Sequence, residues 1–154
     1  MASVGDSVHV AAPVAVVWRL YFEPASWPAW VDGFGSVESS DGYPERAGTL
    51  RWRSTPAGRG TVSERVLEHE PPRLHRIEFA DPESEGELTT AFEAERDPDG
   101  GEGTRVSQEV TYRLRDAGFL GSLTEPIFIR PQVARSVRRS LDRLRTEAES
   151  APSR

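Results

Sequence analysis

Two ionisable side chains and one arginine are the groups in this sequence best suited to acid–base chemistry. Glu64 and His75 lie in segments where apolar and polar residues alternate, and both fall in the apolar register. A carboxylate and an imidazole on one face can exchange protons with a substrate, as enolisation, aldol cyclisation or dehydration requires. Arg130, on the apolar stripe of the C-terminal segment, could pair with Glu64 or stabilise an enolate oxygen. These three are the candidate catalytic residues.

Each of the three also has a structural interpretation. An inward-facing histidine is more often a hydrogen-bonded structural residue than a catalyst. Pro131 could rotate its turn so that the Arg130 guanidinium extends to water. A bulge in a strand could turn Glu64 or His75 outward. The sequence leaves both interpretations open.

The same alternation places a mostly apolar set of side chains on the inward face of the strands. A largely apolar cavity with a few convergent polar groups is the usual composition of a small-molecule site. Polar groups in this register suggest a water-containing interior, because each buried polar group without a partner costs about 1–3 kcal/mol. The predicted ligand-binding residues are Trp30, Trp52, Ile77, Phe79, Leu88, Thr90, Phe92, Gln108, Val110, Tyr112 and Phe128.

Several classes of chemistry find no support in the sequence. Without cysteine or lysine the chain has no thiol nucleophile, no thiolate metal ligand and no Schiff-base amine. It contains no Gly-x-Ser-x-Gly, phosphate-loop or dinucleotide motif. His69 and its flanking glutamates are separated from His75 by a Pro-Pro turn and match no metal-ligand spacing. We therefore predict neither a cofactor nor a metal, and a hydrophobic small molecule as the partner.

Net charge and hydropathy bear on the binding partners and the cellular location of the chain. The net charge of −6 repels nucleic acid, and the arginines of the C-terminal segment are interpreted as a solvated face. The sequence contains no run of 18 apolar residues, so no membrane span is predicted. Its N-terminus lacks the pattern of a signal peptide. The expectation is a cytoplasmic monomer or homodimer. The all-arginine basic set hints at a GC-rich, bacterial genome.

The elements that must position these residues follow from two periodicities. After a short strand around Val8 and Val10, apolar residues recur with period two from Gly35 to Leu114, interrupted by the turn signals TPAGRG, HEPPR, DPESEG and DPDGGEG. This pattern predicts an antiparallel sheet of about seven strands, one of them weakly marked around residues 36–40. One face of the sheet should be apolar and the other charged.

Helical periodicity marks the segments on either side of the sheet. Two short helices are expected between Pro13 and Val31, separated at Pro24. Apolar residues recur at intervals of three and four from Leu120 to Leu144, which predicts a long amphipathic helix ending near residue 148. Prolines at 126 and 131 predict that its first half is kinked or that it begins late.

The fold class predicted from these elements is α+β. An antiparallel sheet with one apolar face must cover that face, and the long C-terminal helix is the element large enough to do so. The sheet should therefore curve around this helix. Residues 1–149 are expected to form a single domain, and residues 150–154 a flexible tail.

Four segments carry a resemblance that spans nearly the whole chain. AAPVAVVWRLYFEPASWPAWVDGFGSVE, GYPERAGTLRWR, VLEHEPPRLHRIEF and GGEGTRVSQEVTYRL occur in that order. Together they resemble the polyketide cyclase/dehydrase and lipid-transport proteins of the SRPBCC, or START-like, superfamily. The resemblance implies the helix-grip fold, in which the short helices close one end of a cavity between the sheet and the long helix. Trp18, Trp27 and Trp30 would anchor these helices by burial, since short helices do not hold themselves together.

The resemblance permits two kinds of function. One is a carrier or sensor that binds a polyketide- or lipid-like molecule. The other is a polyketide aromatase/cyclase that folds and dehydrates a poly-β-ketone chain. The mostly apolar inward positions favour binding. A protein-interaction module, as found elsewhere in the superfamily, is a third and weaker alternative.

Overall fold

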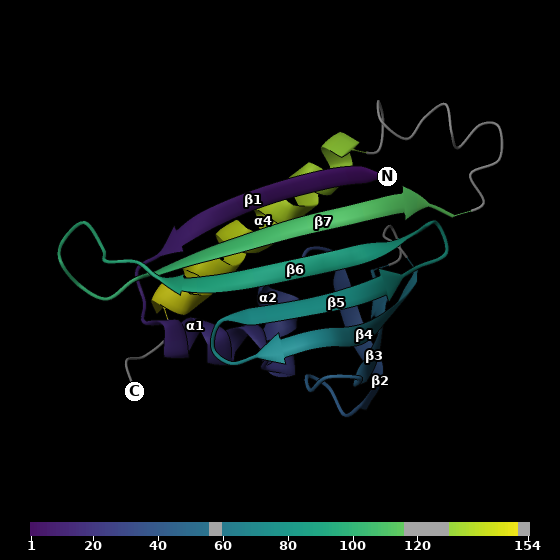
Figure 1. Cartoon of the computed structure of the whole chain (residues 1–154), viewed down its shortest axis with the longest axis horizontal. Coiled ribbons are helices and arrows are strands. Elements are labelled where there is room, and N and C mark those ends of the chain that lie inside the picture. Colours follow the sequence, from purple (N-terminus) through teal and green to yellow (C-terminus); the bar gives the residue numbers. More distant parts are fainter. Residues whose placement is uncertain (56–59, 116–129, 151–154) are drawn as a thin grey trace.

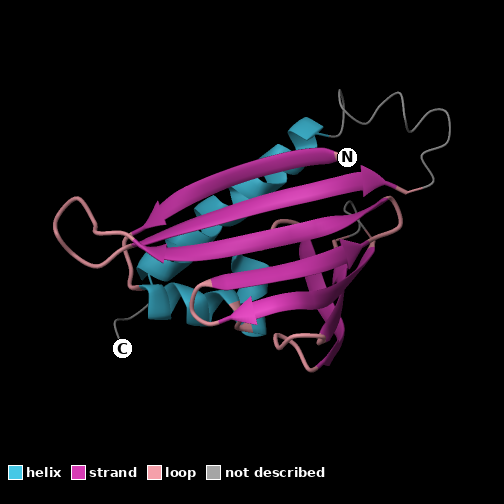
Figure 2. Cartoon of the chain, viewed as in Figure 1, coloured by secondary structure: helices cyan, strands magenta, loops and turns pink. Residues whose placement is uncertain are grey.

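A single antiparallel sheet forms the frame of the protein. The computed structural model describes residues 1–55, 60–115 and 130–150, and within these ranges seven strands are hydrogen-bonded in the order β1-β7-β6-β5-β4-β3-β2 (Figures 1 and 2). The antiparallel sheet predicted from the sequence is confirmed, including the weakly marked second strand. The strands are β1 (Ala2–Val10), β2 (Phe34–Asp41), β3 (Thr49–Ser54), β4 (Thr61–Glu70), β5 (Leu74–Ala80), β6 (Ser84–Ala94) and β7 (Thr104–Leu114).

Alternation along the strands separates an inner from an outer face. In β7 the residues from Thr104 to Tyr112 at even positions are buried, while those between them are partly or fully exposed. The outer face carries cross-strand ion pairs, such as Arg113 with Glu85 at 2.8 Å and Arg76 with Glu87 at 2.7 Å. The period-two pattern therefore reports the two faces of the sheet correctly.

The C-terminal helix α4 (Arg130–Ser150) covers part of the inner face and packs mainly on β1 (Figure 1). Its buried residues are Val137, Leu141, Leu144 and Ala148, which recur at the predicted spacing of three and four. The helix continues to residue 150, two residues beyond the predicted end. The first part of the predicted helix, including Pro126, lies outside the described residues.

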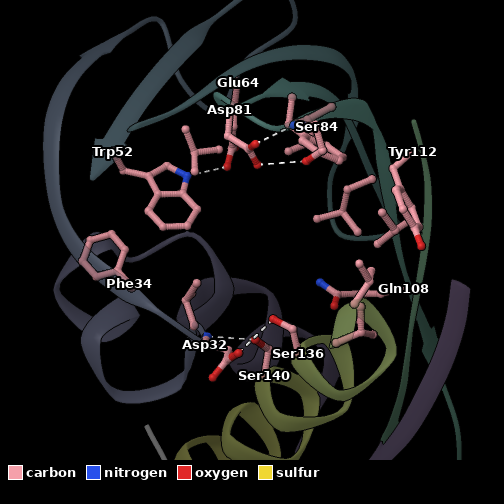
Figure 3. A pocket seen from close by; sticks show the side chains of 18 of the residues that line it. Asp32, Phe34, Trp52, Glu64, Asp81, Ser84, Gln108, Tyr112, Ser136 and Ser140 are labelled. Carbon is pink, nitrogen blue, oxygen red and sulfur yellow. Dashed lines mark hydrogen bonds between the residues drawn. The ribbon is translucent and has the colours of Figure 1, made fainter. Parts of the chain in front are cut away.

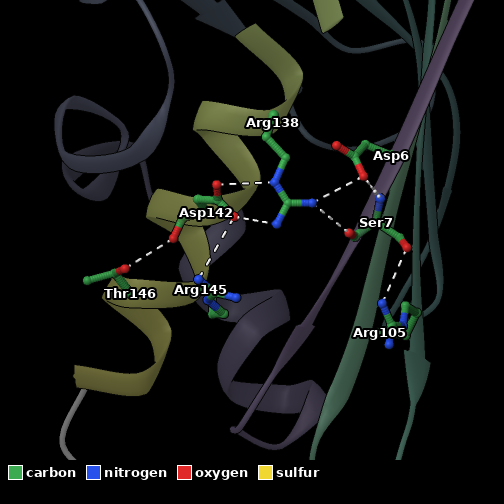
Figure 4. A network of polar contacts seen from close by, with 7 residues as sticks. All are labelled: Asp6, Ser7, Arg105, Arg138, Asp142, Arg145 and Thr146. Atoms are coloured by element: carbon green, nitrogen blue, oxygen red, sulfur yellow. Dashed lines mark hydrogen bonds and ion pairs between the residues drawn. The ribbon is translucent and has the colours of Figure 1, made fainter. Parts of the chain in front are cut away.

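Polar contacts attach α4 to the edge strand. The Arg138 guanidinium binds the carboxylate of Asp142 one turn later at 2.6 Å and that of Asp6 on β1 at 3.2 Å (Figure 4). It also donates to the backbone carbonyl of Ser7 at 3.3 Å. These are half-exposed contacts, so we attribute the position of α4 chiefly to its apolar stripe.

The short helices α1 (Val14–Tyr21) and α2 (Trp27–Trp30) follow β1, with the 3₁₀ turn η1 (Pro24–Ser26) between them. The indole N–H of Trp27 donates to the backbone carbonyl of Tyr21 at 2.9 Å. The indole N–H of Trp30 donates to the Ser26 hydroxyl at 3.0 Å. Burial of both indoles, each with its polar atom satisfied, anchors segments too short to be stable alone.

No helix in the described ranges combines the length and the apolar run needed to cross a membrane.

Candidate functional site

A cavity of about 400 Å3 lies between the inner face of the sheet, α2 and α4 (Figure 3). This volume falls within the range of about 300–1,000 Å3 that is typical of small-molecule sites. Aromatic side chains from α2, β2, β3 and the segment between β2 and β3 line it: Trp27, Trp30, Phe34, Tyr43 and Trp52. The cavity therefore offers flat apolar walls to an aromatic or aliphatic ligand.

Most of the predicted ligand-binding residues line this cavity. They are Trp30, Trp52, Ile77, Phe79, Leu88, Gln108, Val110 and Tyr112. Glu64 and His75 line it as well, so the two candidate acid–base groups share one cavity.

Two predicted ligand-binding residues do not line the cavity. Thr90 is fully buried and its hydroxyl lies 2.8 Å from that of Tyr21, and Phe92 packs edge-on against the Tyr21 ring with centroids 5.3 Å apart. Both face inward as predicted, but α1 covers this part of the sheet through Tyr21. Phe128 lies outside the described residues.

Arg130 requires a correction. Its side chain is exposed at the start of α4 and does not line the cavity. The arginine that does line it is Arg139, nine residues further along the helix. Helical periodicity placed Arg130 on the apolar stripe, yet Val133 and Ala134 are the first residues of α4 that pack against the core, and its fully buried positions begin at Val137.

The Glu64 carboxylate is held at the cavity wall by a tryptophan. It accepts a hydrogen bond of 2.8 Å from the indole N–H of Trp52, which lies diagonally across the β3–β4 pair (Figure 3). Burial raises the pKa of Tyr21 to about 12 and that of Tyr43 well above its ordinary value, and the Glu64 charge adds to both shifts. The two tyrosines therefore stay protonated at neutral pH.

His75 is almost completely buried at the cavity wall. Burial lowers the pKa of its imidazole to about 3, and the neighbouring His69 adds to this shift. Its Nδ1 lies 3.0 Å from the Nδ1 of His69. Its Nε2 is buried and has no hydrogen-bond partner among the described residues. His75 is therefore neutral at physiological pH and holds one unused polar atom.

The orientation of His69 depends on an irregularity in β4. Strict alternation along β4 would turn His69 outward, away from His75. The register between β4 and β5 instead shifts between Val66 and Glu68, and this bulge brings His69 directly opposite His75. The apolar Leu67 in an outward position was the available signal, because a bulge explains such a residue better than regular alternation.

A second polar cluster forms where α2 meets α4, and the sequence carried no signal for it. The Asp32 carboxylate accepts a hydrogen bond from the Ser136 hydroxyl at 2.9 Å, and the Asp32 backbone N–H donates to the Ser140 hydroxyl (Figure 3). The carboxylate also accepts a bond from the Arg139 guanidinium at 3.1 Å. Burial alone would raise the pKa of Asp32, but the bonds from Arg139 and Ser136 outweigh it and lower the pKa. More than 100 residues separate the partners, so only the fold joins them.

Comparisons with known proteins agree with this architecture. The family model described as polyketide cyclase/dehydrase and lipid transport matches residues 1–149. The Zhui aromatase/cyclase of a Streptomyces species has a TM-score of 0.70 and 20% identity, over 96% of this chain and 93% of its own. Truncated norcoclaurine synthase from Thalictrum flavum has a TM-score of 0.65 and 15% identity, over 98% and 95%.

A Thermus thermophilus protein is similar to this chain over the whole of its own length. It has a TM-score of 0.68 and 24% identity, covering 99% of this chain and 100% of that one. No curated protein matches the sequence. At these identities the solved structures support the helix-grip fold alone.

Proposed function

We propose, since this chain belongs to the polyketide cyclase/dehydrase and lipid transport family, that it binds a hydrophobic or aromatic small molecule between the sheet and α4. The observation that carries this proposal is the cavity itself. Its walls are mainly aromatic and aliphatic, and a few polar groups, among them Glu64 and Gln108, reach into it. Such a cavity binds through burial of apolar surface and orients its ligand through the polar groups.

Tryptophan fluorescence tests the proposal directly. Anthraquinone, a flat polycyclic ketone, should quench the emission of the wild-type protein as it enters the cavity. Trp52→Phe should lose a large part of this quenching. Trp18→Phe is the matched control, because Trp18 packs on Phe22 and Phe92 and does not line the cavity. Quenching that is equal in the two variants would place the ligand elsewhere and contradict the proposal.

A second function, polyketide cyclisation by acid–base catalysis, is favoured by one observation. Glu64 and His75 line the same cavity, as proton transfer at both ends of a substrate requires. In a cyclase, Glu64→Gln or His75→Ala would abolish turnover of a poly-β-ketone substrate while anthraquinone still binds. In a carrier the same changes would alter affinity by at most about 1–2 kcal/mol, the scale of one hydrogen bond.

A further inference from the structure

We propose that His69 and His75 form a two-ring proton relay, through which the cavity accepts a ligand oxygen either as a carbonyl or as a hydroxyl group. The inference rests on the proposed ligand binding and narrows it to molecules that carry such an oxygen. Ketones, enols and phenols are the chemical classes concerned. His69 acts through His75, so it is a positioning residue and not a catalytic one.

The geometry of the pair supports this assignment. The two Nδ1 atoms are 3.0 Å apart, a hydrogen-bond distance, and the rings are perpendicular with centroids 5.1 Å apart. His75 is 3% exposed, whereas His69 is half-buried. The pair therefore joins a buried cavity wall to a site that water can reach.

Both rings are neutral when they form this bond. Burial lowers the pKa of His75 and also that of His69, where the Glu45 carboxylate opposes the shift. Each neutral ring carries one proton, so one Nδ1 donates and the other accepts. Two arrangements satisfy this condition, and they differ in whether the His75 Nε2 carries a proton.

In the first arrangement the His69 Nδ1–H donates to the His75 Nδ1, and the His75 Nε2–H can donate to a ligand carbonyl. In the second, the His75 Nδ1–H donates to the His69 Nδ1, the His75 Nε2 can accept from a ligand hydroxyl, and the His69 Nε2 holds the other proton. When His75 gives its Nε2 proton to an enolate or phenolate oxygen, the His69 Nδ1 proton moves to the His75 Nδ1. A water molecule then protonates the His69 Nε2 and leaves as hydroxide, so the ligand oxygen becomes a neutral hydroxyl group and neither ring ends charged.

The unused Nε2 of His75 is the second observation that points to a ligand. A buried polar atom without a partner is energetically unfavourable, and a ligand oxygen would supply that partner. The rings of Phe22, Tyr21 and Tyr43 pack around His75 with centroid distances of 4.7, 6.4 and 5.7 Å. No water reaches Nε2 in this conformation, so an entering oxygen must part these rings.

Among the described residues, the other titratable groups around the pair are two tyrosines and two glutamates. We assign the adjustment of the His75 Nε2 to the ligand oxygen to the histidine relay and not to these groups. Tyr21 from α1 and Tyr43 from the segment before β3 stay protonated. Glu64 on β4 raises the pKa of both tyrosines, and Glu45 acts on His69. The pair can thus change the role of Nε2 from donor to acceptor without placing a charge in the cavity.

Nitrogen NMR of ¹⁵N-histidine-labelled protein tests the relay with two matched probes. 2-Tetralone and 2-naphthol share a bicyclic frame, but the first offers only a carbonyl acceptor and the second a phenolic donor. With 2-tetralone we expect a protonated His75 Nε2 and an unprotonated His69 Nε2. With 2-naphthol we expect the reverse. The signal of His69 Nε2 should therefore move between the two positions, although His69 does not line the cavity.

His75→Phe is the control variant, since it keeps an aromatic ring at the cavity wall and removes the imidazole that connects the ligand to His69. In this variant the His69 signals should be the same with both probes. An unchanged His69 Nε2 signal in the wild-type protein would overturn the relay, and the wild-type spectra alone decide this. The indole N–H signal of Trp52 reports binding separately. If it moves with neither probe, ligand binding itself fails, which is a distinct result.

Discussion

The two halves of the inner sheet face differ in how completely they are filled. Beneath α4, the side chains of β1 and β7 meet the helix in a closed core, where Val10, Val106, Leu141 and Leu144 are each 0% exposed. Toward β3, β4 and β5, α2 and α4 leave open the cavity of about 400 Å3 (Figure 3). One sheet with one apolar face thus supports a packed half, which stabilises the fold, and an open half, which is free to bind.

Histidines on the two faces of the sheet show a related contrast. His9, at the end of β1, lies on the outer face between the buried Val8 and Val10, and both of its ring nitrogens are paired, with Glu95 at 2.5 Å and Asp97 at 2.8 Å. Hydrogen bonds to Asp97 and then to Glu95 raise its pKa. In the cavity wall His75 keeps one nitrogen unpaired, and burial lowers its pKa to about 3. The outer-face histidine thus has both nitrogens satisfied, whereas the histidine in the cavity wall retains capacity for a partner.

The largest expected effect is a difference in stability between two identical substitutions. Leu141→Ala removes a fully buried side chain from the packed half and should lower the free energy of unfolding by about 3 kcal/mol. Leu88→Ala should lower it by about 1 kcal/mol, because the removed methyl groups already border the cavity. Urea unfolding of both variants measures the difference. Equal losses of unfolding free energy in the two variants would mean that the cavity beside Leu88 is filled in solution.

Acidification should produce the next largest effect. His75 has a folded pKa near 3 and an unfolded pKa near 6.5, so below pH 6.5 the unfolded chain binds a proton that the folded chain does not. At pH 5 this difference in pKa should lower the free energy of unfolding by about 2 kcal/mol. The lowered pKa of His69 adds a loss of the same sign. Urea unfolding at pH 7 and pH 5 should show a smaller loss in His75→Phe than in the wild-type protein.

His9 should respond to pH in the opposite direction. Its folded pKa is raised, so its pairing stabilises the protein fully below pH 6.5, and this stabilisation is lost as the pH rises through the folded pKa. His9→Gln should therefore reduce stability more at pH 5 than at pH 9, as urea unfolding at these two values can measure. If His9→Gln and His75→Phe shift the pH profile of stability in the same direction, the contrast between the two histidines is contradicted.

The smallest expected effect separates two adjacent arginines of α4. Arg138 binds Asp6 on the packed side, whereas Arg139 binds Asp32 at the cavity rim. Each Arg→Ala substitution should lower stability only slightly, because these ion pairs are partly exposed. Arg139→Ala should also speed the dissociation of anthraquinone in stopped-flow fluorescence, and Arg138→Ala should not. Equal dissociation rates would show that the contact with Asp32 does not restrain the ligand.

Much of this architecture could be predicted because its signals are local. The period of two along Thr104–Leu114 and the spacing of three and four from Val137 to Ala148 each report which side of one element faces inward. From these patterns follow the sheet, the covering helix and the inward positions of Glu64 and His75. The resemblance of four segments to one family added the helix-grip fold, and the family match over residues 1–149 confirms that family.

Only the tertiary structure determines which groups, or which open space, the inward side chains contact. Alternation shows that Thr90 and Leu88 face inward, but α1 covers the first while the second borders the cavity. Helical periodicity could not choose Arg139 over Arg130, because the position of α4 on the sheet depends on packing between residues far apart in sequence. Asp32 and Ser136 are joined by the same long-range packing, whereas His69 meets His75 within one hairpin because a bulge shifts the register. A local pattern records the side on which a residue lies, and the folded chain determines whether that side holds protein or open space.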